Sequence, residues 1–306
     1  STGRTWSCSF RGRIGRGSAG RRGGDILRQP RAGRLPPAGG AGRPGGVPRV
    51  AVGARVAGIF MQRWLAGEVT PEGATSALGG AIDGMLAEYV VLSQEGVVKI
   101  PSHLTFEEAA SLPCAAVTAW NALVRESHVK AGDTVLLLGT GGVSIFAVQI
   151  AKLFHCRVIA TAGGEEKMAK ALALGADAAA DHYRPDLTDQ LRQATARRGA
   201  DVVFEHVGEA VWKPALAALA PSGRLVTCGA TTGPQASVDI RFLFARHQSL
   251  LGSYMGTLAE LHHVLQFVFT GKLKPVIDSV FPLAGARAAH ERLEAKKQFG
   301  KIVLEV

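Results

Sequence analysis

From residue 134 onward, short apolar runs alternate with longer segments in which apolar and polar residues recur at helical spacing. The runs "TVLLLG" (134–139), "RVIATA" and "DVVFEHVG" are each followed by a helix-like segment, and "GRLVTCG" continues the series. Strands that are apolar throughout are buried on both faces, and their alternation with helices is typical of a parallel sheet covered on both sides. The pattern therefore predicts an α/β fold with a doubly wound parallel sheet.

Shorter elements are predicted before this region. We expect a short strand at "ARVAGIF", strands with turns over residues 85–101, and a helix over about 106–124 that is interrupted near Pro113. Thr105 is a good N-cap for that helix, because two glutamates then fall in the first turn, where carboxylates suit the helix dipole.

Four elements are predicted after the alternating region, and no internal repeat is found. They are a strand over 251–256, helices over 258–270 and 284–294, and a last strand at "GKIVLEV".

The basic charge of the chain is concentrated at its beginning. The 306 residues carry a formal net charge of +10. Residues 1–50 hold 11 Arg, no Lys and one acid (Asp25), whereas residues 51–306 hold 24 Lys and Arg against 24 Asp and Glu. Because no second basic stripe follows, nucleic acid is not expected as a partner of the globular part. Residues 1–50 form a low-complexity Arg/Gly segment of their own.

Composition also bears on location and on cysteine chemistry. No run of about 18 uncharged apolar residues occurs, so we expect no membrane-spanning helix. Cys8, Cys114, Cys156 and Cys228 are far apart and form no CxxC pair. This spacing argues against a disulfide framework and against a cysteine-bound zinc, and a reducing cytoplasm fits best.

The segment "LLLGTGGVSIFAVQIAK" (136–152) carries the strongest chemical signal. Gly139 and Gly141 hold the first two places of a G-x-G-x-x-G turn between a strand and a helix, and Ser144 holds the third. The first glycine permits the tight turn, and the second lets the backbone approach a pyrophosphate at the positive end of the helix. Dinucleotide binding is the prediction; the alternative is a glycine turn in an α/β domain without a ligand.

The end of the second strand of this region bears on which dinucleotide binds. NAD sites usually place Asp or Glu there, to bind the ribose 2′-hydroxyl. Thr161 and Ala162 stand at that place, and small residues leave room for a 2′-phosphate that Lys167 would reach. NADP is therefore favoured over NAD, unless Lys167 only solvates a helix face.

With these residues in view, the chain resembles the medium-chain dehydrogenase/reductase superfamily, and within it the zinc-free, quinone-oxidoreductase-like branch of zinc-type alcohol dehydrogenase-like proteins. The resemblance covers about residues 52–306 and rests on motifs in family order: "GARVAGIFMQRW", "GAIDGMLAEYVVL", "LTFEEAASLPCAAVTAWNAL", "GDTVLLLGTGGVSIFAVQIAK", "LGADAAADHYR", "PSGRLVTCG" and "FGKIVLEV". It implies a Rossmann domain inserted in a partial GroES-like β domain. We expect the remnant of the GroES-like domain over 51–115, the NADP-binding domain over 116–255, and a closing C-terminal part over 256–306.

The resemblance also implies a set of cofactor-binding residues. Thr118 matches the nicotinamide end, and Val207 and Gly208 match the strand end at the nicotinamide ribose. The remaining matches are Gly139, Gly141, Gly142 and Val143 at the pyrophosphate turn, Thr161, Lys167 and Tyr183 at the adenosine end, and Ser253, Tyr254 and Met255 over the nicotinamide.

The family's zinc members use a catalytic Cys/His/Glu set and a four-cysteine lobe, and neither spacing occurs here. His262 and His263 are adjacent on a predicted helix and point in different directions. We expect no metal site and no zinc. Without a Lewis acid, a quinone or an enone is the expected hydride acceptor, since such molecules spread the incoming charge themselves. Gln62, Trp64 and Tyr254 are candidates for lining the acceptor pocket, and a zinc alcohol dehydrogenase is an alternative. The likeness further implies a homodimer joined through the sheet edge at "SLLGSYMG".

Residues 1–50 lack the strands and the motif resembling "NYRDLL" or "NRADLL" with which the family's catalytic domain begins. When "TGRTWSC" is reverse-translated and shifted by two bases, it can be read as a sequence like "NRADLVV". We therefore favour a frameshift upstream of about residue 50 over a disordered Arg/Gly arm. A catalytically impaired NADPH-binding protein, with RNA affinity through its arm, is the alternative function.

Overall fold

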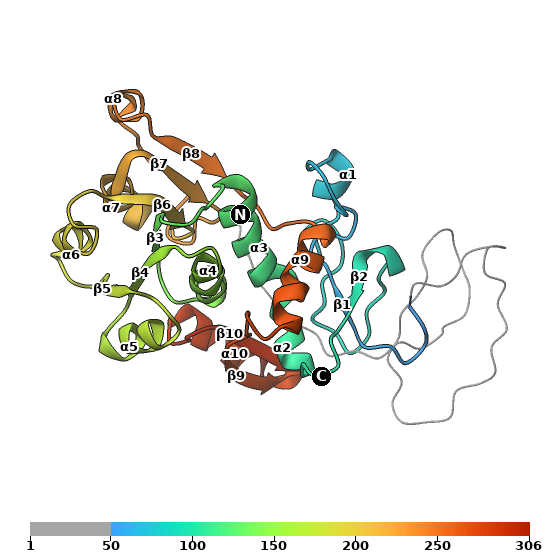
Figure 1. Ribbon diagram of the computed structural model, residues 1–306. Coiled ribbons are helices and arrows are strands. Elements are labelled where there is room, and N and C mark those ends of the chain that lie inside the picture. The colour runs from blue at the N-terminus through green and yellow to red at the C-terminus, as the bar shows by residue number, and fades with distance from the viewer. Residues whose placement is uncertain (1–49) are drawn as a thin grey trace.

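A six-stranded parallel sheet forms the part of the molecule on the left of Figure 1. The structure, a computed structural model, describes residues 50–306. The strands lie in the order β5-β4-β3-β6-β7-β8. They are β3 (Thr134–Leu137), β4 (Arg157–Ala162), β5 (Ala178–Asp181), β6 (Ala200–Glu205), β7 (Leu219–Thr227) and β8 (Ser249–Gly252). Counted from β3, this is the order 3-2-1-4-5-6 of a Rossmann sheet, so the predicted doubly wound fold is confirmed.

Two hydrophobic cores cover the two faces of the sheet, as the apolar runs predict. Along β3, Val135 and Leu137 enter one core and Leu136 and Leu138 the other, because successive side chains of a strand point to opposite faces. The first core includes side chains of α3, α4, α5 and α9, and the second those of α6 and α7. The helices are α3 (Val117–Trp120), α4 (Gly142–Leu153), α5 (Glu165–Ala173), α6 (Leu187–Ala194), α7 (Glu209–Ala217), α8 (Ile240–Ala245) and α9 (Leu258–Phe269).

The helix predicted over 106–124 consists of four short segments: α2 (Phe106–Ala110), η2 (Leu112–Ala116), α3 and η3 (Asn121–Glu126). Thr105 caps α2 as predicted. Its hydroxyl accepts from the Glu108 N–H (3.2 Å), and its own N–H donates to the Glu108 carboxylate (2.8 Å). The interruption at Pro113 is confirmed, because η2 and η3 are wider π-helical turns and proline has no N–H for the regular ladder.

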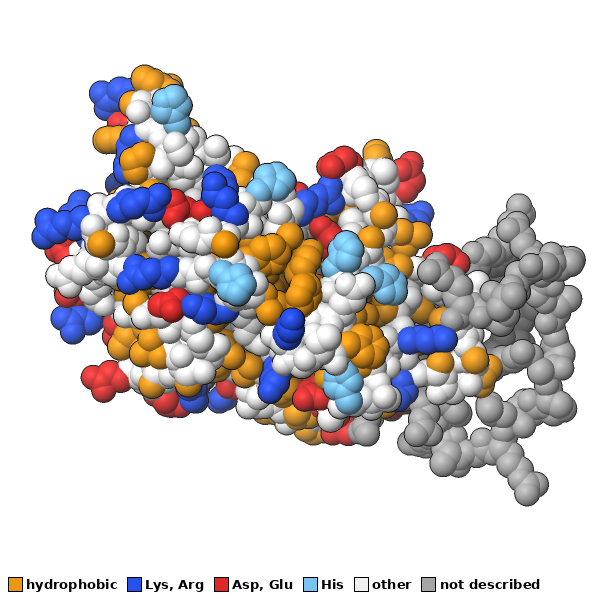
Figure 2. Space-filling view, in the orientation of Figure 1, with side chains coloured by type: hydrophobic (Ala, Val, Ile, Leu, Met, Phe, Trp, Pro, Cys, Tyr) orange, Lys and Arg blue, Asp and Glu red, His pale blue; other side chains and the backbone are white. Residues whose placement is uncertain are grey.

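The strands predicted over residues 85–101 are mostly absent, which is a correction. Only β2 (Val97–Lys99) forms; it follows the single turn η1 (Gln94–Gly96) and pairs antiparallel with β1 (Val56–Gly58). The short helix α1 (Pro71–Ala74) lies between β1 and β2. Among the described residues no further strand covers Val52, Leu86 and Val91, which are at least half exposed, and Figure 2 shows apolar side chains on this right-hand part of the molecule.

The C-terminal part forms a small parallel sheet of its own, made of β9 (Ile277–Pro282) and β10 (Lys301–Glu305). The turn η4 (Leu283–Gly285) and helix α10 (Ala286–Glu294) connect these two strands. The last strand is confirmed, whereas β9 was not predicted, because its "IDSVFP" mixes polar residues with a final proline. The strand predicted over 251–256 ends earlier, at Gly252, since Met255 has a left-handed φ of +57° that a strand does not admit.

Within the described residues, no helix is long and apolar enough to cross a membrane. The Arg/Gly segment, with the frameshift and RNA-arm hypotheses that concern it, lies outside the described residues apart from its last position. The domain boundaries at 115 and 255 stay predictions.

Candidate cofactor site

The carboxyl ends of β3 and β6 lie side by side where the strand order reverses. The chain runs from β3 outward to β4 and β5, and then returns to β6 on the other side of β3. Ligands of open parallel sheets bind in the crevice outside such a switch point. The predicted glycine turn follows β3, and Val207 and Gly208 follow β6. The structure thus brings these two groups of predicted residues to the same edge.

The glycine turn leaves open space in front of a helix end. Gly139 has a φ of +86°, and its N–H donates to Oγ1 of Thr161 on β4 (2.9 Å). Gly141 is the N-cap of the 12-residue helix α4, and a Cβ on it would meet no heavy atom within 4 Å. The first N–H groups of a helix have no partner within it, and that end is partially positive. A pyrophosphate group fits this cradle, which Gly142 and Val143 continue.

Ser144, at the third place of the motif, is buried under the turn and links β3 to β6. Its hydroxyl lies 3.2 Å from the carbonyl oxygen of Leu138 and 2.7 Å from Nε2 of His206. A Cβ on Gly139 would lie 3.9 Å from Cε1 of the same His206 ring. Burial lowers the pKa of His206, although the neighbouring Glu205 partly offsets this.

The carboxyl end of β4 offers small and basic groups. A Cβ on Gly163 would collide with the ring of Tyr183, so this ring lies over the turn after β4. Tyr183 is 67% exposed, which leaves its outer face accessible. The Lys167 ammonium donates to the carbonyl of Lys296 (2.6 Å), and burial lowers the pKa of Lys167. Thr161 is buried, and its hydroxyl accepts from the turn as described above.

A buried carboxylate organises the loop after β6. Glu205 is fully buried, and one of its oxygens accepts from the N–H groups of Val207 and Gly208, each at 2.5 Å. Its other oxygen accepts from the hydroxyl of Thr227 on β7 (2.9 Å). Gly208 has a φ of +94°, and a Cβ there would lie 2.6 Å from the carbonyl oxygen of Gly233. The loop is therefore held in one tight conformation beside the glycine turn.

Two segments far apart in sequence meet at the predicted nicotinamide end. The Thr118 hydroxyl donates to the carbonyl of Cys114 (2.6 Å) and lies 3.6 Å from the sulfur of Met255. The Asn121 amide donates to the Ser253 hydroxyl (3.3 Å). Oδ1 of Asn121 is buried without a hydrogen-bond partner. Burial raises the pKa of the Cys114 thiol, so this group is neutral at pH 7.

The three candidates for the acceptor pocket differ in their surroundings. Tyr254 is 45% exposed and packs edge-on against Phe60, with ring centroids 6.4 Å apart. Gln62 and Trp64 are buried. The Gln62 amide donates to the backbone carbonyls of Ile59 (2.5 Å) and Gly96 (3.2 Å), and the Trp64 indole donates to that of Gly67 (3.0 Å). In this structure Gln62 therefore joins the segments next to β1 and β2, whereas Trp64 packs with Met61 and Ala77 in the loop between these strands.

The turn also receives a basic residue that the sequence reasoning missed. Gly300 forms a bridge to Gly141, and its N–H donates to the carbonyl of Thr140 (3.1 Å). Lys301 follows, is 6% exposed, and lies so close to Gly142 that a Cβ there would collide with its side chain. Both residues belong to the "FGKIVLEV" motif, but nothing in the sequence indicated that β10 reaches the glycine turn.

Among residues 50–306, no three His, Cys, Asp or Glu side chains converge as a metal site would require. The described donor set therefore does not fit a tetrahedral zinc. The absence of zinc stays a prediction, because residues 1–49 are outside the description.

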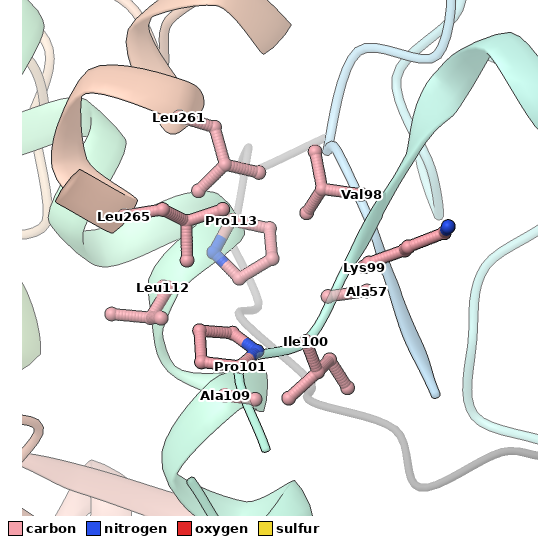
Figure 3. Close-up of a pocket in the computed structure, with 10 residues that line it drawn as sticks. All are labelled: Ala57, Val98, Lys99, Ile100, Pro101, Ala109, Leu112, Pro113, Leu261 and Leu265. Atoms are coloured by element: carbon pink, nitrogen blue, oxygen red, sulfur yellow. The ribbon is translucent and has the colours of Figure 1, made fainter. Parts of the chain in front are cut away.

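A small apolar pocket lies elsewhere, between β2, η2 and α9, as Figure 3 shows. Its cavity volume is about 10 Å³, and it is lined by residues such as Val98, Pro113 and Leu261. None of the predicted cofactor residues lines it, and it is smaller than the roughly 300–1,000 Å³ of ordinary ligand pockets.

The fold and the glycine turn are typical of dinucleotide-binding proteins, and comparisons with known proteins show which class this chain belongs to. A family model described as "Zinc-binding dehydrogenase" matches residues 142–270. A zinc-type alcohol dehydrogenase-like protein of Schizosaccharomyces pombe is 34% identical over 254 residues, which cover 81% of this chain and 73% of the relative. Human quinone oxidoreductase is 30% identical over 233 residues, which cover 73% and 70%.

Solved structures extend the same likeness to the fold. A crystal structure of an NAD-dependent alcohol dehydrogenase has a TM-score of 0.76 and 39% identity, covering 84% of this chain and 77% of that one. A 2-octenoyl-CoA carboxylase reductase in complex with NADP and 2-octenoyl-CoA has a TM-score of 0.72 and 27% identity, covering 83% and 63%. The chain belongs to the medium-chain dehydrogenase/reductase superfamily and is an NAD(P)-dependent oxidoreductase.

Proposed function

We propose that this oxidoreductase uses NADPH and reduces a quinone or a conjugated enone without zinc. The observation that carries the cofactor choice is the end of β4, where Thr161, Ala162 and Gly163 provide no carboxylate for a ribose 2′-hydroxyl. Burial has the largest effect on His182 and lowers its pKa; Asp181 opposes this, and Lys167 and Lys296 lie close enough to lower the pKa further. These two lysines favour the additional phosphate of NADP over the free hydroxyl of NAD.

Replacing Lys167 by methionine tests the cofactor choice. We expect the Kd for NADPH to rise about tenfold, since a charge-assisted bond to phosphate is lost, while the Kd for NADH stays within about twofold. Lys170→Met is the matched control, because Lys170 lies on the same helix and pairs with Glu166 (2.5 Å). Fluorescence titrations with both cofactors measure the difference, and an equal loss for NADH and NADPH in Lys167→Met would contradict the assignment.

The residues of the cradle explain how the chain would hold the cofactor. The α4 N-terminus and Gly141 bind the pyrophosphate, the loop held by Glu205 supports the adjacent ribose, and the layer of Thr118, Ser253 and Met255 places the nicotinamide. The bound cofactor supplies the hydride. The chain supplies orientation and the exclusion of water.

The proposed acceptor class follows from the side chains that could bind a metal. Since the described residues form no cluster that would hold a Lewis-acidic metal beside a simple ketone, an acceptor that delocalises the incoming charge is favoured. The likeness to human quinone oxidoreductase and to a reductase solved with an enoyl thioester supports this class. Tyr254, which is half exposed and adjacent to Met255, is the candidate for contacting the acceptor. Gln62 and Trp64 are buried and are the candidates for supporting the pocket wall.

The proposal is tested by NADPH oxidation at 340 nm with a soluble quinone, a conjugated enone and a simple alcohol–ketone pair. We expect turnover with the first two and none with the third, and added zinc should not change the rates. Preferential, zinc-stimulated turnover of the ketone would instead support an alcohol dehydrogenase.

A catalytically impaired NADPH-binding protein is a second candidate, favoured by one observation. In residues 50–105 the structure holds β1, β2, the single turns α1 and η1, and loops, and Val52, Leu86 and Val91 are 50–61% exposed. A described part that leaves these apolar side chains exposed would position an acceptor less well. Under this alternative NADPH binds, but no acceptor accelerates its oxidation.

We further propose a homodimer in the cytoplasm, joined through β8. This strand is the edge of the sheet, and Leu250 on it is 36% exposed, with Ile240, Phe242 and Phe244 of α8 at 60–69%. Figure 2 shows apolar side chains on the α8 projection. An open edge beside an apolar patch favours pairing with another copy. Sedimentation should give about twice the 32.0 kDa chain mass, and Leu250→Lys should return it to one chain.

A further inference from the structure

The ring of His206 and the hydroxyl of Ser144 are placed where they can couple the glycine turn to a proton. Ser144 stands on the third residue of α4, within the helix end that faces the cradle. His206 follows the last residue of β6, and β6 pairs directly with β3. The turn is thereby held from both neighbouring strands, by Thr161 of β4 on one side and by His206 on the other.

The hydrogen bonds of Ser144 determine which tautomer of the His206 ring the site prefers. Ser144 has one hydroxyl hydrogen, and two acceptors compete for it: the Leu138 carbonyl (3.2 Å) and Nε2 of His206 (2.7 Å). Both contacts are satisfied together only when Nε2 carries hydrogen, so that His206 donates to Ser144 and Ser144 donates to Leu138. A second proton would then enter at Nδ1 without breaking either bond. Protonation of His206 therefore costs desolvation but no hydrogen bond.

The groups around His206 determine whether its ring is neutral or protonated. Glu205, the adjacent residue of the strand, is a buried carboxylate and favours the imidazolium form. The Cys228 thiol, from the loop after β7, is neutral because burial raises its pKa. The Lys301 side chain lies against Gly142, the first residue of the helix on which Ser144 stands. In the protein without cofactor, burial prevails and the pKa of His206 lies below its ordinary value.

We propose that the Ser144–His206 pair positions the glycine turn, and that His206 takes up a proton when a diphosphate binds at the end of α4. This inference rests on the proposed binding of the cofactor at that turn. Two negative charges bound at the helix end that carries Ser144 would favour the imidazolium form and so oppose the effect of burial. His206 is a positioning residue, since it acts on the cofactor through Ser144 and Gly139.

The sign of the resulting pH dependence follows from linkage. If bound diphosphate raises the pKa of His206, affinity is highest below the pKa of the free protein. Affinity then falls as the pH rises through the window up to the pKa of the complex, and becomes constant above it. A rise of about one unit corresponds to a tenfold change in affinity across the window and to an uptake of roughly half a proton at its centre.

The test uses ADP-ribose, which carries the diphosphate but neither the nicotinamide nor the titrating 2′-phosphate. Isothermal titration calorimetry of the full chain at a series of pH values from 5 to 8, in two buffers of different ionisation enthalpy, should show the uptake within one window of that range. In His206→Gln, which keeps a donor to Ser144 but cannot titrate, the uptake should vanish while the affinity at pH 8.5 stays within about threefold. His182→Gln is the control histidine and should keep the uptake.

Two further readouts keep the test decisive. The ring resonances of His206 in the wild-type chain should titrate at higher pH with ADP-ribose than without it, even if His206→Gln fails to fold. Ser144→Gly should keep the proton uptake but weaken ADP-ribose binding at pH 8.5 by about threefold to tenfold, because the turn loses its tie to β6. Uptake that persists in His206→Gln, or ring resonances that do not move, would overturn the inference. If ADP-ribose does not bind at all, the cofactor site itself fails.

Discussion

Replacing Gly141 by valine should abolish cofactor binding while leaving the stability of the fold nearly unchanged. Gly141 has an ordinary φ of −75°, and a Cβ on it would meet no heavy atom within 4 Å, so the folded chain accepts a larger residue. The new side chain would occupy the space assigned to the pyrophosphate. We expect the Kd for NADPH to rise about 100-fold or more, with the free energy of unfolding changed by less than about 0.5 kcal/mol.

Gly139→Val is the matched comparison for this substitution. Gly139 has a φ of +86°, a conformation that a β-branched residue adopts only with strain of about 1–3 kcal/mol. This variant should therefore lose stability as well as binding. NADPH titration and urea unfolding of both variants separate the two effects. If Gly141→Val bound NADPH normally, the pyrophosphate would not lie at the end of α4.

Replacing Glu205 by alanine should damage both stability and cofactor binding. The carboxylate accepts from Val207 and Gly208 and from the Thr227 hydroxyl, so its removal leaves three donors at a buried position without an acceptor. We expect a loss of about 3 kcal/mol in the free energy of unfolding, measured in urea, and at least a tenfold rise in the Kd for NADPH as the loop after β6 loosens.

Glu165→Ala is the control for Glu205→Ala, because Glu165 is an exposed acid at the start of α5. It should change stability by less than about 0.5 kcal/mol. Equal stability of the Glu205 and Glu165 variants would show that the buried carboxylate does not hold the loop.

The sheet and its glycine turn could be predicted because a local sequence pattern indicates each of their elements. The apolar runs of β3, β4, β6 and β7 bury both faces, and Gly139 and Gly141 stand where a strand passes into a helix. The residues that complete the site could not be found in this way, because their roles arise from contacts between distant segments. Glu205 and His206 belong to an apolar run, and only the folded chain shows their side chains bonded to the next loop and to Ser144.

The incorrect strand prediction has a similar physical cause. The segment 85–101 contains enough valine and tyrosine to predict strands, but a strand forms only where a partner pairs with it, and β2 has only β1 within the described residues. The assignment of Gln62 and Trp64 to the acceptor pocket stays a prediction. Their burial and their bonds to backbone carbonyls depend on packing that a local pattern does not encode.

A fluorescence titration of the purified full chain with NADPH and with NADH, carried out in parallel on Gly141→Val, tests both the choice of cofactor and its place in the fold. We predict saturable binding of one NADPH per chain, at least about tenfold tighter than NADH, and its loss in the variant. Tighter binding of NADH would contradict the assignment of the β4 end. Binding of NADPH that survives Gly141→Val would contradict the placement of the cofactor between β3 and β6.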